Sequence, residues 1–155
     1  MAGTIDKRLQ ELGIELPEAA TPAANYVPWV VTGNLVFVAG QITFWNGELK
    51  HKGRIGDDLS VEDGQAAARI CALNIIAQVK NACGGDLDRV VRCVKLGGFV
   101  TSTPDFIDQP KVINGASDLL VDVFGDKGRH ARFAVAAPSL PLGVSVEVDA
   151  IFEIA

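Results

Sequence analysis

The stretch Arg89-Val-Val-Arg-Cys-Val-Lys-Leu-Gly-Gly-Phe-Val-Thr101 is the longest strand-forming run in the chain, and it decides what fold we expect. Strict alternation places Val90, Val94, Leu96 and Val100 on one face and Val91, Cys93 and Phe99 on the other. Both sets are largely apolar, which is typical of a strand in a sheet that is covered on both sides. We therefore predict a strand whose second face also needs a covering layer.

Four further strands and two long helices are predicted around it. The strand signals fall at residues 26–31, 35–41, 131–137 and 144–154. One helix begins at Ser60 and ends before Gly84-Gly85, and the other lies within residues 106–124. This order predicts an α+β fold in which one mixed sheet packs on two main helices. Residues 1–25 are expected to add a short helix and an extended arm, residues 16–25, to a single domain spanning residues 1–155.

Two helices can cover only one face of such a sheet. If the other face is as apolar as the strand at residues 89–101 indicates, a second copy of the chain must cover it. We therefore expect a homo-oligomer.

Composition narrows the class of protein and of partner. Hydrophobic residues make up 48% of the 155 residues, and the net charge is −5, so no nucleic-acid partner is expected. No apolar run reaches the ~20 residues of a membrane span, and the N-terminus does not resemble a secretory signal. Three cysteines without a C-x-x-C pair (Cys71, Cys83 and Cys93) argue against a disulfide framework and a zinc site. These features predict a cytoplasmic protein with no metal site and no membrane partner.

Arg132 and Glu147 are the first candidate functional residues. Arg132 interrupts the apolar run 131–137, and Glu147 lies on the polar side of the last strand. Arg132 could form a structural salt bridge with Glu147, or it could bind the carboxylate of a ligand through two parallel hydrogen bonds. Glu147 could belong to a solvated acidic edge, or it could position and deprotonate a water molecule.

Three other places are open to two interpretations. Asn114-Gly115 falls inside the second predicted helix, where glycine costs about 1 kcal/mol relative to alanine. The helix could start or break there with Ser117 as its cap, or the pair could mark a functional place. Tyr26 could be an ordinary aromatic of an edge strand, whereas Phe44 and Trp45 could line a pocket or fill a subunit contact.

An ordered set of short segments carries a family resemblance. The segments are Gly33-Asn-Leu-Val-Phe-Val-Ala-Gly-Gln41, Asp105-Phe106 followed by Asn114, Ala131-Arg132, Leu140-Pro141 and Val146-Glu147-Val148. In this order and spacing, from about residue 26 to residue 154, the chain resembles the RidA/YjgF family. These are the reactive-intermediate (enamine/imine) deaminases, also labelled endoribonuclease L-PSP. The N-terminal helix and the long connection at residues 43–60 resemble a longer-chain subgroup.

The resemblance implies a chorismate-mutase-like fold and a homotrimer with three clefts between subunits. It also implies roles for six residues. Arg132 would grip a substrate carboxylate, Glu147 would help to place the attacking water, Tyr26 and Asn114 would line the cleft, and Gly40 and the main chain at Ala134 would supply backbone contacts.

The leading hypothesis is an enzyme that hydrolyses 2-imino acids, tautomers of 2-aminoacrylate-type enamines, to 2-keto acids and ammonia. The substrate is a small carboxylate, and no metal or organic cofactor is expected because an imine carbon is already electrophilic. The alternative is a non-catalytic trimer that binds keto or amino acids. It is motivated by Ala39, where the family usually has serine, and by Phe133-Ala134-Val135 after Arg132, where the family often has Arg-Ser-x-Val with cysteine in the third place. A ribonuclease ranks third, since only the older family label supports it.

Overall fold

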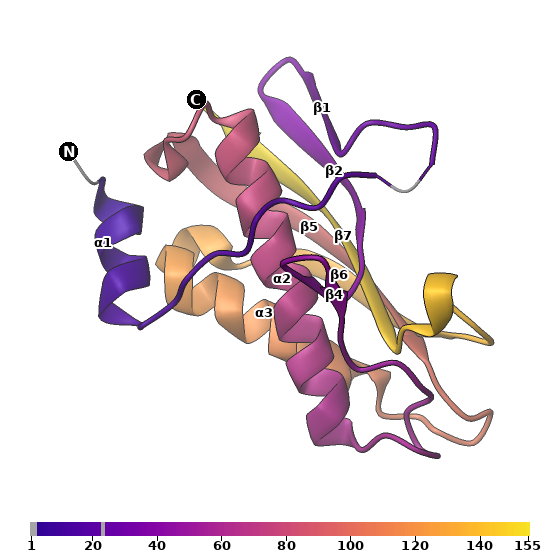
Figure 1. Cartoon of the computed structure of the whole chain (residues 1–155). Coiled ribbons are helices and arrows are strands. Elements are labelled where there is room, and N and C mark those ends of the chain that lie inside the picture. Colours follow the sequence, from indigo (N-terminus) through magenta and orange to yellow (C-terminus); the bar gives the residue numbers. More distant parts are fainter. Residues whose placement is uncertain (1–2, 23) are drawn as a thin grey trace.

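The two long helices lie on one side of a five-stranded sheet (Figure 1). The computed structural model describes residues 3–22 and 24–155. The sheet has the order β1-β2-β7-β5-β6, with β1 at Trp29–Thr32, β2 at Leu35–Gln41, β5 at Val90–Thr101, β6 at Ala131–Ala137 and β7 at Val146–Ile154. Because β6 runs parallel to β5 and the other pairs are antiparallel, the sheet is mixed, as predicted.

The helices confirm the predicted α+β class, and the short N-terminal helix is also where the sequence predicts it. They are α1 at Thr4–Glu11, α2 at Val61–Ala82 and α3 at Gln109–Phe124, with 3-10 turns at Leu87–Arg89, Gly125–Gly128 and Pro141–Gly143. A small hairpin of β3 (Phe44–Trp45) and β4 (Glu48–Leu49) turns at Asn46-Gly47. Among the described residues, no helix combines the length and the apolar character needed to cross a membrane.

Helix α2 begins where the sequence predicts because Ser60 and Asp63 cap each other. The Ser60 hydroxyl accepts a hydrogen bond from the Asp63 amide at 3.1 Å, and the Asp63 carboxylate accepts one from the Ser60 amide at 2.9 Å. The helix then packs against β7, β2 and α3, which places it at the centre of the core.

The predicted alternation of the longest strand is wrong at its centre. The pairing of β5 with β7 shifts between Val90 and Arg92 and again between Cys93 and Lys95. Such a shift places an extra residue in one strand and reverses which side chains face the core. Cys93 is therefore buried on the helix side together with Leu96, whereas Val94 is 37% exposed.

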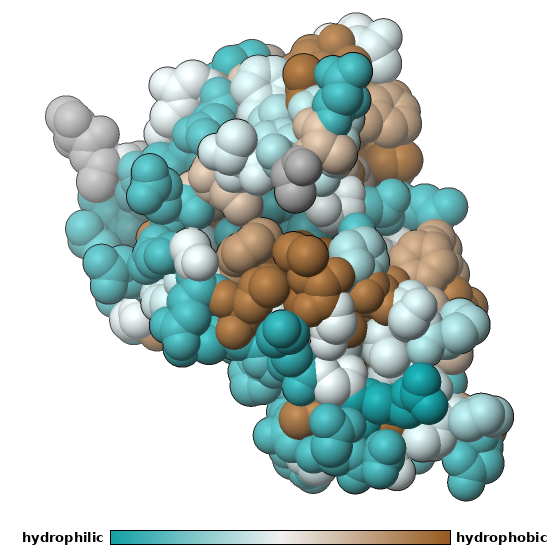
Figure 2. Space-filling model, turned by 45° about the vertical axis from the view of Figure 1, so that its right-hand side comes forward, coloured by the Kyte–Doolittle hydropathy of each residue, from teal (hydrophilic) through white to brown (hydrophobic). Residues whose placement is uncertain are grey.

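The side of the sheet away from the helices, called the open face here, still carries large apolar side chains. Phe37 pairs with Ile151 of β7, and Phe99 pairs with Val135 of β6. Phe37, Phe99 and Val135 are 41%, 37% and 42% exposed. Figure 2 views the molecule from the side of the helices and the β1 edge, and apolar side chains gather across the middle of that view too, so exposed apolar surface is not confined to the open face.

The Asn114-Gly115 pair does not break α3, so the interpretation of a helix that starts or stops there is wrong. Both residues lie inside the continuous helix Gln109–Phe124. A Cβ atom at Gly115 would collide with the main-chain carbonyl oxygen of Gln65 in α2. The glycine is therefore explained by the close crossing of α2 and α3, which offsets its poor helix propensity.

Candidate functional site

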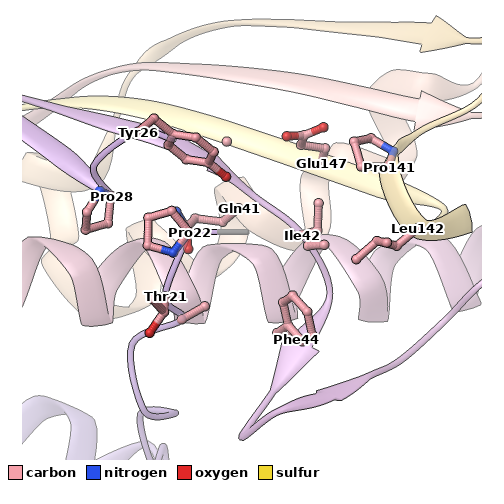
Figure 3. Close-up of a pocket in the computed structure, with 12 residues that line it drawn as sticks. Thr21, Pro22, Tyr26, Pro28, Gln41, Ile42, Phe44, Pro141, Leu142 and Glu147 are labelled. Atoms are coloured by element: carbon pink, nitrogen blue, oxygen red, sulfur yellow. The ribbon is translucent and has the colours of Figure 1, made fainter. Parts of the chain in front are cut away.

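A pocket of about 200 Å³ opens beside the start of β7. Its walls come from the N-terminal arm (residues 16–25), the chain before β1, the end of β2 with the residues that follow it, the β6–β7 connection and β7 itself. The lining residues are Ala20, Thr21, Pro22, Tyr26, Pro28, Gly40, Gln41, Ile42, Phe44, Pro141, Leu142 and Glu147. In Figure 3 the Tyr26 hydroxyl and the Glu147 carboxylate point toward the space between them, while Phe44 and Leu142 lie on the opposite side. Three predicted site residues, Tyr26, Gly40 and Glu147, thus meet at one cavity. We call them the pocket half.

Gly40 makes room for Glu147. The pairing of β2 with β7 shifts between Val38 and Gln41, so Gly40 lies in a bulge of the strand. A Cβ atom at Gly40 would collide with the Glu147 carboxylate. The missing side chain therefore lets this carboxylate lie directly against the backbone of β2 at the pocket wall.

The surroundings of Glu147 favour its protonated form. The side chain is half-buried, and burial raises the pKa of Glu147 above the usual carboxyl range. The carboxylate of Asp149, on the same side of β7, raises this pKa further, and burial raises the pKa of Asp149 as well. A carboxyl group with a raised pKa suits proton transfer near neutral pH.

Arg132 is held at the edge of the sheet by α3. Its Nη1 donates a hydrogen bond to the Ser117 hydroxyl at 3.0 Å, and its Nη2 donates to the Pro110 carbonyl at 2.9 Å. A guanidinium has five N–H donors, so three remain for other acceptors. Among the described residues no carboxylate pairs with Arg132; the ion pairs lie elsewhere.

His130 fixes the direction of the hydrogen bonds around Arg132. Its Nδ1 lies 2.6 Å from the Gly128 carbonyl, which can only accept, so Nδ1 carries the proton of the neutral ring. Nε2 then accepts from the Ser117 hydroxyl at 2.8 Å, and this leaves the lone pairs of Ser117 for Arg132. Burial lowers the pKa of His130, and the nearby Arg132 charge lowers it further, so the ring is neutral at pH 7.

Asn114 and Ala134 lie in the neighbourhood of Arg132. Asn114 is exposed on α3, on the same helix face as Pro110 and Ser117, which both contact Arg132. Ala134 is two residues from Arg132 in β6 and pairs with Gly98 of β5. We call Arg132, Asn114 and Ala134 the arginine half.

The two halves do not meet within one chain. Arg132 pairs with buried Leu96 and points to the helix side, whereas Glu147 pairs with Phe99 on the open face. Strand β5 also separates β6 from β7, so their axes are about 10 Å apart. The predicted salt bridge between Arg132 and Glu147 is therefore wrong for the isolated chain.

Several residues of these surroundings are missed by sequence reasoning. Ser117 and His130 lie on different elements, so nothing in their spacing indicates the hydrogen bond between them. Leu142 has a left-handed backbone with φ of 59°, which is unusual for a leucine and is not visible as a motif. For Phe44, the interpretation as a pocket residue is the one that the structure supports.

The cysteines carry no sign of reactivity or metal binding. All three are buried, and burial raises the pKa of the Cys93 thiol to about 12 and that of Cys71 still higher. A neutral buried thiol is a poor nucleophile. Within residues 3–22 and 24–155, no three His, Cys, Asp or Glu side chains gather as a metal site would require.

Comparison with known proteins places the chain in a family. Residues 6–154 match the family described as "YjgF/chorismate mutase-like, putative endoribonuclease". The chain therefore belongs to the YjgF family, and its fold is the chorismate-mutase-like α+β fold of that family.

Particular relatives cover nearly the whole chain. Protein TCP17 of Trypanosoma cruzi is 50% identical over 99% of this chain and 96% of its own length. The structure of Atu1372 from Agrobacterium tumefaciens is 51% identical with a TM-score of 0.91, covering 97% of this chain and 92% of that one. A Shewanella oneidensis structure with the same endoribonuclease description is 38% identical with a TM-score of 0.94, covering 98% of this chain and 100% of its own.

More distant structures carry other names of the family. RidA from an Antarctic Psychrobacter is 27% identical with a TM-score of 0.60, covering 90% of this chain and 98% of its own. The E. coli protein TdcF, whose structure holds bound serine, is 25% identical with a TM-score of 0.58, covering 90% of this chain and 94% of its own.

Proposed function

We propose that this protein hydrolyses 2-imino acids, the tautomers of 2-aminoacrylate-type enamines, to 2-keto acids and ammonia. One observation carries the proposal: Arg132 is oriented by two hydrogen bonds, keeps free N–H groups and has no carboxylate partner among the described residues. Such a guanidinium suits a ligand carboxylate, which it can hold through two parallel hydrogen bonds. The relationship to RidA, and the serine bound to TdcF, support a small amino-acid-like ligand.

The reaction needs both halves of the site. The arginine half would hold the substrate carboxylate, and Glu147 in the pocket half would take a proton from water as its oxygen attacks the imine carbon. The same carboxyl group would return that proton to nitrogen, which gives an adduct with one hydroxyl and one amino group. It would then take the hydroxyl proton and pass it to the amino nitrogen, so that the C=O bond forms as the C–N bond breaks and ammonia leaves. The raised pKa of Glu147 makes it a stronger base than an ordinary carboxylate, which favours its taking this proton and returning it.

Because the two halves point to opposite sides of one sheet, we propose that the site forms between copies of the chain in a homotrimer. The open face supports this assembly, since Phe37, Phe99 and Val135 are large, apolar and more than a third exposed. Burying such side chains stabilises an interface by about 25 cal/mol per Å². The contact would bring the Glu147 side of one copy toward the Arg132 edge of the next.

A second candidate function is binding of keto or amino acids without turnover. The serine in TdcF shows that a relative holds such a ligand. Nucleic-acid cleavage, which the family description mentions, has less support because the net charge of −5 opposes phosphate binding.

The test is ammonia and keto-acid release from freshly generated 2-imino acids, with the wild type and Arg132→Ala side by side. We expect kcat/KM to fall on the order of 10²-fold in the variant, since both binding and alignment are lost. Arg129→Ala is the matched control, because Arg129 is an exposed arginine three residues away that pairs only with Asp126 at the surface.

Three results are informative. Acceleration by the wild type and Arg129→Ala but not by Arg132→Ala supports the proposal. Keto-acid binding that needs Arg132, without any acceleration, favours the binding trimer. Equal turnover by Arg132→Ala contradicts the role of this residue.

A further inference from the structure

The described part of the N-terminal arm before residue 23 forms one wall of the pocket. Ala20, Thr21 and Pro22 line the cavity opposite residues that follow β2 and precede β7. Figure 3 shows Thr21 and Pro22 on a segment that passes below Tyr26, beside the pocket. The arm therefore belongs to the site rather than to a separate appendage.

A buried glutamine fastens this arm. Gln78 of α2 is 1% exposed, and its Nε2 donates to the Ala20 carbonyl at 2.8 Å and lies 3.5 Å from the Gln41 Oε1 atom. Gln41 also lines the pocket. A buried amide is costly to leave unpaired, so this contact holds the arm against the floor of the cavity.

Two further contacts fix the chain on the N-terminal side of Ala20. The Glu18 amide donates to the Asn46 side chain at 2.9 Å. Helix α1 is tied down where Asp88 accepts from the amides of Thr4 and Ile5, both at 2.9 Å. The arm is thus a fixed wall whose position depends on side chains of the main fold.

The cavity has room for a bulky apolar group. The lining is largely apolar and includes Ile42, Phe44, Pro22, Pro28, Pro141 and Leu142. Among the described lining residues, Glu147 is the only one of the Asp, Glu, Lys, Arg and His types. An engineered protein cavity of about 150 Å³ holds benzene, so about 200 Å³ accommodates a branched aliphatic or aromatic side chain. The described lining offers no cationic partner for a second carboxylate, so burying one there is costly, and Glu147 in the ionised form that accepts a proton would also repel it.

We propose that the cavity between the arm and Leu142 is the pocket that holds the side chain of the substrate. Gln78 fixes the arm in place as one wall of this pocket. The pocket selects 2-imino acids with branched aliphatic or aromatic side chains over those with a methyl or an acidic side chain. The expected difference in turnover rests on the proposed function, whereas the expected difference in binding does not. A few added methylenes in an apolar pocket change kcat/KM by roughly 10- to 200-fold.

The experiment compares 2-imino acids generated in situ by an amino acid oxidase from leucine, phenylalanine, alanine and glutamate. We expect the wild type to hydrolyse the first two with kcat/KM roughly 10-fold or more above the last two. Calorimetry with the four corresponding 2-keto acids measures the same preference without any reaction.

Two variants test whether Leu142 and Gln78 create the preference for bulky side chains. Leu142→Gly removes an exposed apolar wall at a position whose φ of 59° favours glycine, so the fold is not put at risk. Gln78→Met keeps the length of the side chain but removes the hydrogen bond to Ala20. Both should reduce the leucine-to-alanine ratio several-fold, whereas Glu18→Ala, an exposed side chain of the same arm, should not.

The outcomes separate this inference from the proposed function. If no imino acid is hydrolysed but the bulky keto acids bind more tightly, and Leu142→Gly removes that preference, the side-chain pocket stands and the reaction fails. If small and bulky ligands bind and react alike, or if both variants leave the ratio unchanged, the pocket assignment is overturned.

Discussion

The covered and the open face of the sheet are built from the same strands but are completed in different ways. On the covered face Leu96, Val100 and Phe152 have no exposed surface, because α2 and α3 pack on them. On the open face Phe99, one residue from Val100, is 37% exposed. The chain thus covers one side of its sheet by itself and leaves large apolar side chains exposed on the other.

The same comparison applies to the candidate site. Arg132 points to the covered side, where α3 supplies its hydrogen-bond partners. Glu147 points to the open side, where Gly40 makes room for it. A site that uses both residues must therefore draw on two copies of the chain.

The largest expected difference between the two faces is in how much a substitution lowers the free energy of unfolding. Phe152→Ala removes a fully buried ring that packs on Phe124 with a centroid distance of 5.9 Å, and it should cost about 3–5 kcal/mol. Phe99→Ala should cost less in a dissociated chain, because the ring is partly exposed and contacts Phe133. Urea denaturation at low protein concentration measures both, and equal losses would contradict the difference between the faces.

The next effect concerns assembly. Val135→Asp places a charge on the open face of edge strand β6, so we expect dissociation at micromolar concentration in sedimentation velocity. Ala66→Asp adds the same charge to an exposed position of α2 and should leave the assembly intact. An unchanged sedimentation coefficient for Val135→Asp would show that the open face is not the interface.

A smaller effect is expected from His130 on the covered side, which should make the stability of the fold depend on pH. Burial lowers its folded pKa, so the unfolded chain binds the proton first as pH falls below about 6.5, and stability is lost there. His130→Gln keeps an acceptor for Ser117 but cannot titrate. Between pH 7 and pH 5.5 its melting temperature should therefore fall by roughly 2–4 °C less than that of the wild type. His51→Asn is the control for the second histidine, and a His130→Gln curve parallel to the wild type would refute this origin.

The smallest effect is expected for Glu147 on the open side. Its raised pKa means that the folded chain holds a proton more tightly, so stability falls as pH rises from the ordinary carboxyl range through the raised value. Glu147→Gln removes this loss and should raise the melting temperature at pH 8 on the order of 2 °C while reducing turnover. A lower melting temperature at pH 8 would mean that the ionised carboxylate stabilises the fold.

Local patterns predict most of this fold, and their failures have physical causes. Ser60 marks the start of α2 correctly because capping chemistry acts within a few residues. The faces of Cys93 and Val94 were assigned wrongly because the bulges depend on how β5 pairs with β7. Pairing is a tertiary property, and no pattern within one strand contains it.

The candidate site residues can be picked out of the sequence one by one, but their arrangement in space cannot. Arg132 and Glu147 stand out as charges in or beside apolar strands, and the family resemblance adds Tyr26, Gly40, Asn114 and Ala134. Their division between two sides of the sheet follows from strand order and register, which the sequence does not display. The same holds for Gln78, whose partner lies 58 residues away.

The most direct test of the shared site is complementation between two inactive variants. Arg132→Ala and Glu147→Ala are purified separately, unfolded, mixed in equal amounts and refolded together, and imino-acid hydrolysis is measured against each variant refolded alone. If each site takes Arg132 from one copy and Glu147 from another, random mixing restores about a quarter of the wild-type activity. Mixed oligomers that form but stay as inactive as the separate variants would contradict the account, because both residues would then have to act from one chain.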